Sequence, residues 1–423
     1  MRRLSSWVDE RSAPVTATTV FVAAGLVYTV MWSALARHGW QSVSDLWNSA
    51  DIGLAISHGH WATVYGSGSQ LDAPPGLEFA LAPFMALGHA LGLRTAAEMH
   101  HGYAVFWLVL VPVVTVLASS VLFALDAVAR RWRFSDPERL GLSLVAGIGV
   151  VSAVVFWGHP EDCVALAFVL WAALAVDRDR SAGLARAGWL LGIAVAFQPL
   201  ALLAAAPVLA RFGWRALPAS VGRVALPSVV VVLPELVTHT ARTLHQIADQ
   251  PFFPADESST PFSHLARSLG NGMYSGGTLR LVATVAAIAL GWVACRHRHD
   301  LPTVLFVMAV AFSIRVLLES ELLGFYFFPV IALSLLLAMR QGWWRFGWCA
   351  ALSVVCIALG NRREHAIMLW WPAIMATTIA MVVLAYGALA QGDRGRVDLP
   401  RLGRPRAGEP PRVTISHVRL LDG

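Results

Sequence analysis

The sequence predicts an all-α polytopic membrane protein, and three observations carry this prediction. Of the 423 residues, 57% are hydrophobic and only 14% are charged, whereas soluble domains contain about 25% charged residues. The mean hydropathy is +0.61. Apolar runs of about 16–25 residues recur along the chain, close to the length that a helix needs to cross a bilayer. Because these runs are continuous and do not alternate with polar residues, they exclude a transmembrane β-barrel.

The distribution of arginines predicts how the chain crosses the membrane. The N-terminus is basic, so the positive-inside rule puts the start of the first helix, residues 17–36, in the cytoplasm and the following loop outside. The Arg-rich stretches between later apolar runs face the cytoplasm only if the apolar segment Gly76–Leu93 does not cross. We therefore expect this segment to form a juxtamembrane or re-entrant helix on the outer face.

The predicted architecture is a bundle of about 12 transmembrane helices with outer-face juxtamembrane helices. Residues 1–390 form one unit, and residues 391–423 form a flexible, basic cytoplasmic tail that contacts anionic lipid. Pro199 interrupts an apolar run after Gln198, which leaves open two short half-spans or one kinked helix. The predicted crossings are 17–36, 102–125, 140–157, 163–177, 184–198, 199–210, 219–238, 278–295, 301–318, 322–339, 346–360 and 367–390.

Neither the charge nor the cysteines indicate a soluble partner or a redox role. The net charge is +6, and all basic side chains are arginines that gather mostly between apolar runs, so the positive-inside rule explains them without nucleic acid. The cysteines lie in or beside apolar runs without CxxC spacing, and we expect buried thiols. They are Cys163, Cys295, Cys349 and Cys356.

Acids and histidines concentrate in the segments that this topology places outside. Ionisable groups near the bilayer are costly, so their gathering on one side suggests a site. The outer segments hold Asp45, Asp51, Asp72, His159, Glu161, Asp162, His239, Arg242, His245, Asp249, Asp256, Glu257, His264 and Arg267, with Arg315, Glu319 and Glu321 nearer the hydrocarbon.

The first outer segment, Asp45–Gly76, is acidic and aromatic and contains neither Arg nor Lys. Its start predicts an amphipathic helix that ends near His58-Gly59, with Leu46, Ile52, Leu54 and Ile56 among its apolar members. A carboxylate at Asp45 could deprotonate the hydroxyl of an acceptor. Ser44 or Asp45 would equally suit the N-cap of this helix, so both roles stay open.

A second outer segment, WGHPED from Trp157 to Asp162, joins two apolar runs. Pro160 and the two acids after it match the preferences of a helix N-terminus. That explanation leaves His159 without a role, whereas a carboxylate with a histidine near the membrane face can hold sugar hydroxyls. His58 and His60 have HxH spacing, but no HExxH motif or further marked ligand accompanies them, so we expect no metal site.

Arg242, Arg267 and Arg315 are outward exceptions to the positive-inside rule, and on this topology Arg94, Arg362 and Arg363 join them farther from the acidic loops. A guanidinium near the headgroups pairs with an anion. The anion is either lipid phosphate in general or a polyprenyl phosphate leaving group held through two hydrogen bonds. His264 could assist.

The order of several short motifs resembles the GT-C superfamily of membrane glycosyltransferases, over about residues 15–390. More narrowly, it looks like the actinobacterial branch that uses polyprenyl-phosphate-mannose. The motifs are a first helix followed by Asp45-Leu46, then Gly59, Val64-Tyr65, Pro74-Pro75-Gly76, GHPED at 158–162, STPFSHLA at 259–266 and GFYFFP at 324–329. Gln198 stands before Pro199 where the family often has Lys.

This resemblance implies an inverting, metal-independent transfer without a cofactor, on the outer face of the plasma membrane. The donor would be a polyprenyl-phosphate sugar, with mannose ahead of arabinose or glucose, and the acceptor a lipid or glycan. By position, Asp45 would be the general base and Asp51 the second choice. The donor phosphate would meet Arg242, His264, Arg267 and Arg315, and the sugar or acceptor His58, Trp61, Tyr65, His159, Glu161 and Asp162. The alternative function is a transporter or lipid-linked-sugar flippase, which would place ionisable residues at mid-membrane.

Overall fold

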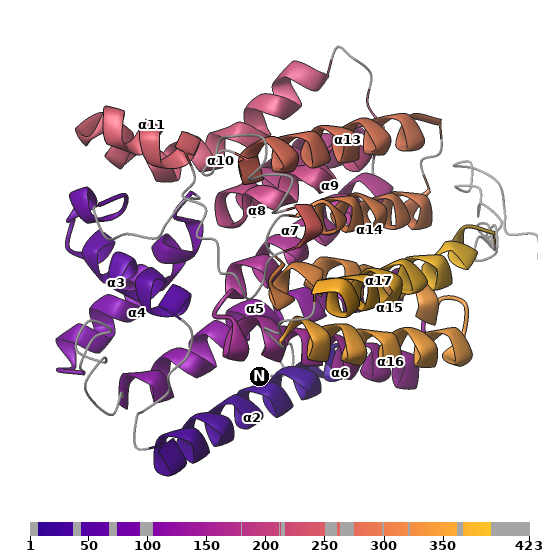
Figure 1. The fold of residues 1–423 in the computed structure, drawn as a ribbon, viewed down its shortest axis with the longest axis horizontal. Coiled ribbons are helices and arrows are strands. Elements are labelled where there is room, and N and C mark those ends of the chain that lie inside the picture. Colours follow the sequence, from indigo (N-terminus) through magenta and orange to yellow (C-terminus); the bar gives the residue numbers. More distant parts are fainter. Residues whose placement is uncertain are drawn as a thin grey trace, which may run out of the picture.

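The fold is a bundle of helices, as predicted. The computed structural model describes residues 7–36, 44–66, 74–93, 105–178, 180–210, 212, 216–249, 260–262, 275–297, 300–319, 322–361 and 367–390. These ranges contain helices and connecting turns but no strand. Long helices lie side by side, and three shorter ones, α3, α4 and α11, gather at one end of the bundle (Figure 1). The predicted tail, 391–423, lies outside the described residues.

The helices follow the apolar runs of the sequence closely. They are α2 (Ser12–Ala36), α3 (Ser44–Ser57), α4 (Gly76–Ala90), α5 (Val105–Arg131), α6 (Asp136–Val151), α7 (Pro160–Arg178), α8 (Arg180–Phe197), α9 (Leu202–Leu209), α10 (Leu217–Thr238), α11 (Thr240–Asp249), α13 (Ser275–His297), α14 (Leu301–Leu317), α15 (Phe328–Met339), α16 (Trp343–Gly360) and α17 (Ile367–Ala390). Short helical turns are η1 (Trp61–Thr63), η3 (Ser152–Phe156), η4 (Pro199–Ala201) and η6 (Gly324–Phe327).

Five segments among the described residues are long and apolar enough to cross a membrane: Leu110–Arg131, Asp136–Phe156, Leu217–Thr238, Trp343–Gly360 and Leu369–Leu389. Six shorter apolar helices accompany them. These lengths and compositions support a membrane protein. The predicted count of about 12 crossings is not confirmed by them and stays a prediction.

The core lies around α7 and α15. Every residue of α15 is buried, as expected of a helix that is apolar on all sides. α7 is buried along most of its length and contacts α5 and α8. The outer helices instead expose large apolar side chains, such as Val230 in α10, Leu281 in α13 and Val383 in α17. An apolar outer surface of this kind suits contact with lipid.

A buried ion pair joins α5 to α6 at the end of the bundle away from α3 and α4 (Figure 1). Nε of Arg139 donates to Asp126 Oδ1 at 2.6 Å, and the Asp126 side chain is only 2% exposed. Arg139 also donates to the exposed Asp136 and to the carbonyl of Glu10, both in the same end. A capping box of Ser135 and Glu138 begins α6. Together these contacts tie the N-terminal helix to the α5–α6 turn.

Pro199 divides an apolar run into two helices rather than kinking one. α8 ends at Phe197, and Gln198 is extended with φ −149° and ψ 113°. A short 3₁₀ turn over Pro199–Ala201 then leads into α9. The residue before a proline avoids the α region, which explains the break. α8 contacts mainly α7 and α10, whereas α9 contacts mainly α13 and α14. The division therefore gives the second helix a different main set of neighbours.

α3 and α4 pack against each other and form the layer at the end of the bundle. The predicted amphipathic helix is confirmed: α3 ends at Ser57, its residues Leu46, Ile52 and Ile56 are buried, and Leu54 is partly buried. α4 also contacts α7, α8 and α10. α4 therefore covers Gly76–Ala90 of the predicted segment and lies beside α3. Its placement at the membrane surface stays a prediction.

Gly76 is the point where α4 touches α8. A Cβ added at Gly76 would lie 2.2 Å from the carbonyl oxygen of Ala196 and 2.9 Å from the nitrogen of Phe197. Both atoms belong to the backbone, so they cannot move aside as a flexible side chain would. The absence of a side chain at Gly76 is therefore a condition for this close approach.

We predict that Gly76→Ala lowers the stability of the protein by about 1–3 kcal/mol, because the added methyl group overpacks the α4–α8 contact. Gly222→Ala is the matched control: Gly222 lies in α10, and an added Cβ meets nothing within 4 Å. Alanine there should raise stability by up to about 1 kcal/mol through helix propensity. Thermal unfolding in detergent measures both, and equal effects would contradict the close approach.

We also predict that Asp126→Ala costs about 3 kcal/mol or more, because it leaves the buried Arg139 without its main counter-charge. Asp136 is the exposed partner of the same arginine, and the Asp136 side chain is 86% exposed. Asp136→Ala should therefore cost under about 1 kcal/mol. Unfolding midpoints of the two variants in the same detergent give the comparison. A loss for Asp136→Ala as large as that for Asp126→Ala would refute this ranking.

Candidate functional site

The WGHPED segment begins with an irregular turn that is held in place from several sides. α6 passes into the π-helical segment η3, a distortion found frequently at functional sites. Gly158 then adopts a φ of +73°, which favours glycine. The indole N–H of Trp157 donates to Asn361 Oδ1 at 2.6 Å. This bond joins the turn to the end of α16 and thereby positions the start of α7.

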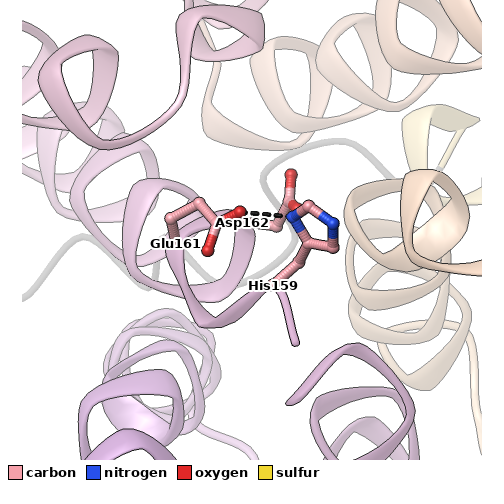
Figure 2. A group of neighbouring side chains, drawn as sticks. All are labelled: His159, Glu161 and Asp162. Atoms are coloured by element: carbon pink, nitrogen blue, oxygen red, sulfur yellow. Dashed lines mark hydrogen bonds and ion pairs between the residues drawn. The ribbon is translucent and has the colours of Figure 1, made fainter. Parts of the chain in front are cut away.

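His159, Glu161 and Asp162 form a compact group at the start of α7 (Figure 2). Nδ1 of His159 pairs with Oε1 of Glu161. The His159 ring stacks on Phe325, with ring centroids 3.6 Å apart and an interplanar angle of 18°. Asp162 is buried, and its Oδ1 accepts from the side-chain amide of Gln198 at 3.1 Å. Three of the six residues expected to contact a sugar or acceptor are thus neighbours.

Glu78 adds another carboxylate to this region from α4. It is buried, with 3% of its surface exposed, and its Oε1 accepts from the hydroxyl of Ser49 in α3 at 2.7 Å. Burial raises the pKa of Glu78 from its ordinary value of 4.5 to about 7, and the bond from Ser49 lowers it in part. The charges of Glu161 and His159 also act on Glu78, which places it electrostatically beside the His159 group.

A small pocket, with room for about one water molecule, lies between α7, η4, α14, η6 and the start of α15. Leu200, Phe312, Val316 and Pro329 form its apolar wall, and Asp162, Arg315, Glu319 and Tyr326 its polar part. Arg315 is buried and forms an ion pair with Glu319 one turn later. A guanidinium has several N–H donors, so it can hold one carboxylate and still donate to another anion. The pocket thus combines an anion-binding group with carboxylates and an aromatic ring.

The residues predicted in the first outer segment do not all share one environment. Asp45 lies in the first turn of α3, one turn before Ser49, but its side chain lies outside the described residues. Asp51 is partly buried in the same helix. His58 is exposed, with its ring edge-on to His89, and Trp61 stacks on Phe79. The base and N-cap roles of Asp45 therefore both remain predictions.

Tyr65, which the resemblance would place against a sugar or acceptor, is buried in a small apolar cluster. It is 1% exposed and packs with Ile52, Ile56 and Val64 of the first segment and with Val232 of α10. This cluster fastens the segment after α3 to α10. The packing explains why a large aromatic residue occupies the position.

The predicted phosphate-binding residues are separated in the structure. Arg315 lines the pocket beside Asp162, whereas Arg242 is exposed on α11. His264 and Arg267 lie outside the described residues. Near Arg242, the carboxylate of Glu235 in α10 pairs with His239 Nδ1 at 3.3 Å. Arg315 is therefore the arginine that the described structure brings to the acids.

Sequence reasoning missed Glu78, although an acid inside an otherwise apolar segment was a signal. The acid lies in the first turn of a helix, where acids are common and stabilising, so its position alone did not indicate a site. Its contact with Ser49 joins residues 29 positions apart. Only the docking of α4 on α3 and α8 reveals that this acid faces His159 and Glu161.

Comparison with known proteins does not assign the chain to a family. No protein-family model, curated protein or solved structure matches it. The resemblance to the GT-C superfamily therefore stands on the motifs of the sequence alone.

The raised pKa of Glu78 predicts a pH-dependent stability. In the unfolded chain the carboxyl loses its proton near pH 4.5, whereas in the folded protein it keeps the proton to about pH 7. The folded state binds more protons between these values, so stability falls as the pH rises from about 4.5 to 7. Glu78→Gln removes this dependence and should gain up to about 3 kcal/mol over the native protein by pH 8.

Unfolding midpoints of the native protein and Glu78→Gln at pH 5, 6, 7 and 8 test this expectation. The two curves should diverge above pH 5, with the variant the more stable. Glu138→Gln, at the opposite end of the bundle, controls for the response of the detergent to pH. Parallel curves for native protein and Glu78→Gln would show that the Glu78 carboxyl is not held in a desolvated environment.

Proposed function

We propose that this protein is a membrane glycosyltransferase that moves a sugar from a polyprenyl-phosphate donor to a lipid or glycan acceptor. The observation that carries the proposal is the pocket beside Asp162. There a buried Arg315 lies with carboxylates and Tyr326 against an apolar wall. The donor has the same combination of chemistry: an anionic phosphate, a hydroxyl-rich sugar and an apolar chain.

The placement of this pocket at one end of the bundle supports the proposal further. Asp162 lies in the first turn of α7, Gln198 directly follows α8, and Arg315 lies in the last turn of α14. α7 and α8 both contact α4. A lipid-linked sugar carries its polar group at the membrane surface and its chain in the hydrocarbon. A site at the end of apolar helices can receive both parts at once. In the proposed topology this end faces the outside of the plasma membrane.

In the proposed reaction, a carboxylate of α3, Asp45 first and Asp51 second, takes the proton of the acceptor hydroxyl. The acceptor oxygen forms a bond to the anomeric carbon, while the bond from that carbon to the phosphate oxygen breaks. The electron pair leaves with the polyprenyl phosphate, and Arg315 stabilises its charge. Attack opposite the leaving group inverts the anomeric centre. His159 and Glu161 would hold sugar hydroxyls through hydrogen bonds.

Glu78 would act on this site by positioning α3. Its carboxylate accepts the Ser49 hydroxyl, and Ser49 lies one turn after Asp45 and two residues before Asp51. The buried acid thereby fixes the register of α3 against α4. A positioned base needs this kind of support, because small displacements of a catalytic group reduce its rate contribution strongly.

The transporter or flippase alternative has less support. Transporters place ionisable groups near the middle of their spanning helices. In the described spanning segments the charged residues lie within about two turns of one end. α15, the most buried helix of the core, contains none. The polar groups therefore gather at the ends of the bundle, where a surface reaction could use them.

We predict that Asp45→Asn lowers sugar transfer by about 10²–10⁴-fold, because asparagine cannot accept the acceptor proton. Membranes containing the variant would be incubated with radiolabelled polyprenyl-phosphate-mannose, arabinose or glucose, and the labelled product identified. Asp51→Asn distinguishes the second-choice base, since only the true base should give the large loss. Asp9→Asn, an exposed acid near the N-terminus, is the matched control.

Membrane insertion and thermal unfolding of each variant separate loss of catalysis from loss of folding. Full transfer by both Asp45→Asn and Asp51→Asn would reject a base on α3. Absence of transfer from every polyprenyl-phosphate sugar by the native protein would reject the glycosyltransferase proposal.

A further inference from the structure

The His159 group has the composition and spacing of a metal site. His159, Glu161 and Asp162 each offer one ligand atom, and these atoms lie within 4.8 Å of one another (Figure 2). In an octahedral site with bonds of about 2.1 Å, ligand atoms are about 3.0 Å apart when adjacent and about 4.2 Å apart when opposite. Small side-chain adjustments would bring the three atoms to these separations.

Two carboxylate oxygens in the group lack hydrogen-bond partners within the described part of the chain. They are Oδ2 of Asp162 and Oε2 of Glu161, and both are inaccessible to solvent. The Asp162 side chain is 97% buried, and only its Oδ1 is engaged, by Gln198. A buried carboxylate oxygen without a partner is costly. A bound cation would satisfy both oxygens at once.

The local charge also favours a cation. The charges of Glu161 and His159 act on both Glu78 and Asp162. Arg315, the nearby arginine, already forms an ion pair with Glu319. Among the described residues, the carboxylates around His159 therefore outnumber the basic groups. A divalent cation would bind two of these carboxylates, and a neutral imidazole would complete its ligands.

The ligands are held by contacts that do not depend on a metal. The bond of Trp157 to Asn361 fixes the turn, Pro160 begins α7, and Phe325 supports one face of the His159 ring. Gln198 orients Asp162 from the break between α8 and α9. A binding site with such preformed support loses little freedom when it takes an ion.

We propose that His159, Glu161 and Asp162 form a binding site for a divalent transition-metal ion. One imidazole and two carboxylates suit Mn²⁺ or Zn²⁺, which accept nitrogen and oxygen ligands, better than Ca²⁺, which takes oxygen ligands only. The site departs from the metal-free transfer that the resemblance implies. The site uses His159 and Glu161, which the proposed function assigns to sugar hydroxyls. Its binding test needs no donor lipid, so the metal site can succeed or fail separately from sugar transfer.

The test measures Mn²⁺ binding to the purified full chain in detergent after treatment with a chelator. Electron paramagnetic resonance of free Mn²⁺ gives the stoichiometry and affinity without any donor lipid. We expect one Mn²⁺ per chain, and at least a ten-fold weaker affinity in Glu161→Gln, Asp162→Asn and His159→Ala. The matched control is His245→Ala, an exposed histidine of α11, which should bind Mn²⁺ as the native protein does. Zn²⁺ should displace the bound Mn²⁺.

Three results would overturn the proposal: no stoichiometric binding of Mn²⁺ or Zn²⁺ by the native protein, equal affinity in the cluster variants, or an equal loss in His245→Ala. The first of these would leave the paired His159 and Glu161 as an ion pair without a metal. Size-exclusion profiles and helicity by circular dichroism establish that each variant is folded. If Asp162→Asn does not fold, Glu161→Gln decides the question, because that side chain is only partly buried.

Discussion

The close backbone contact between α4 and α8 is the constraint on which the candidate site depends. Gly76 has no side chain, so the start of α4 can lie directly against the carbonyl of Ala196. This contact brings Glu78, two residues later, toward the turn that begins α7. It also sets α3, which packs on α4, over the same end of the bundle. One close approach therefore positions the acids of two separate segments.

The candidate site collects polar groups at places where helices end or break. α7 begins after the Gly158 turn, α8 ends at Gln198, and η6 precedes α15. Helix ends leave backbone groups without intrahelical partners, so polar side chains are tolerated there at lower cost than inside an apolar helix. The core helix α15 carries no charged residue and only one polar one, Ser334. This division explains how one bundle can be both apolar enough for a membrane and polar enough at one end for chemistry.

Burial gives the carboxylates of the site properties that exposed acids lack. Glu78 is held by Ser49 and desolvated, and Asp162 is engaged through one oxygen only. Such groups respond strongly to a proton, a cation or a ligand hydroxyl, because few water molecules compete for them. The sugar-transfer proposal and the metal-site proposal use this same property in different ways. The first treats His159 and Glu161 as hydrogen-bonding partners of a sugar, and the second as ligands of an ion.

The sequence by itself determined the all-α class, the apolar character of the bundle and most helix positions, because hydrophobic runs and proline breaks act locally. It also identified the amphipathic α3 and the grouping of His159, Glu161 and Asp162, which lie close in the chain. Tertiary structure alone decided that the charges of Glu161 and His159 act on Glu78, that Tyr65 is buried and that Arg315 lines the same pocket as Asp162. These contacts join residues far apart in the chain, and their formation depends on which helix surfaces pack together, a choice that local pattern does not encode.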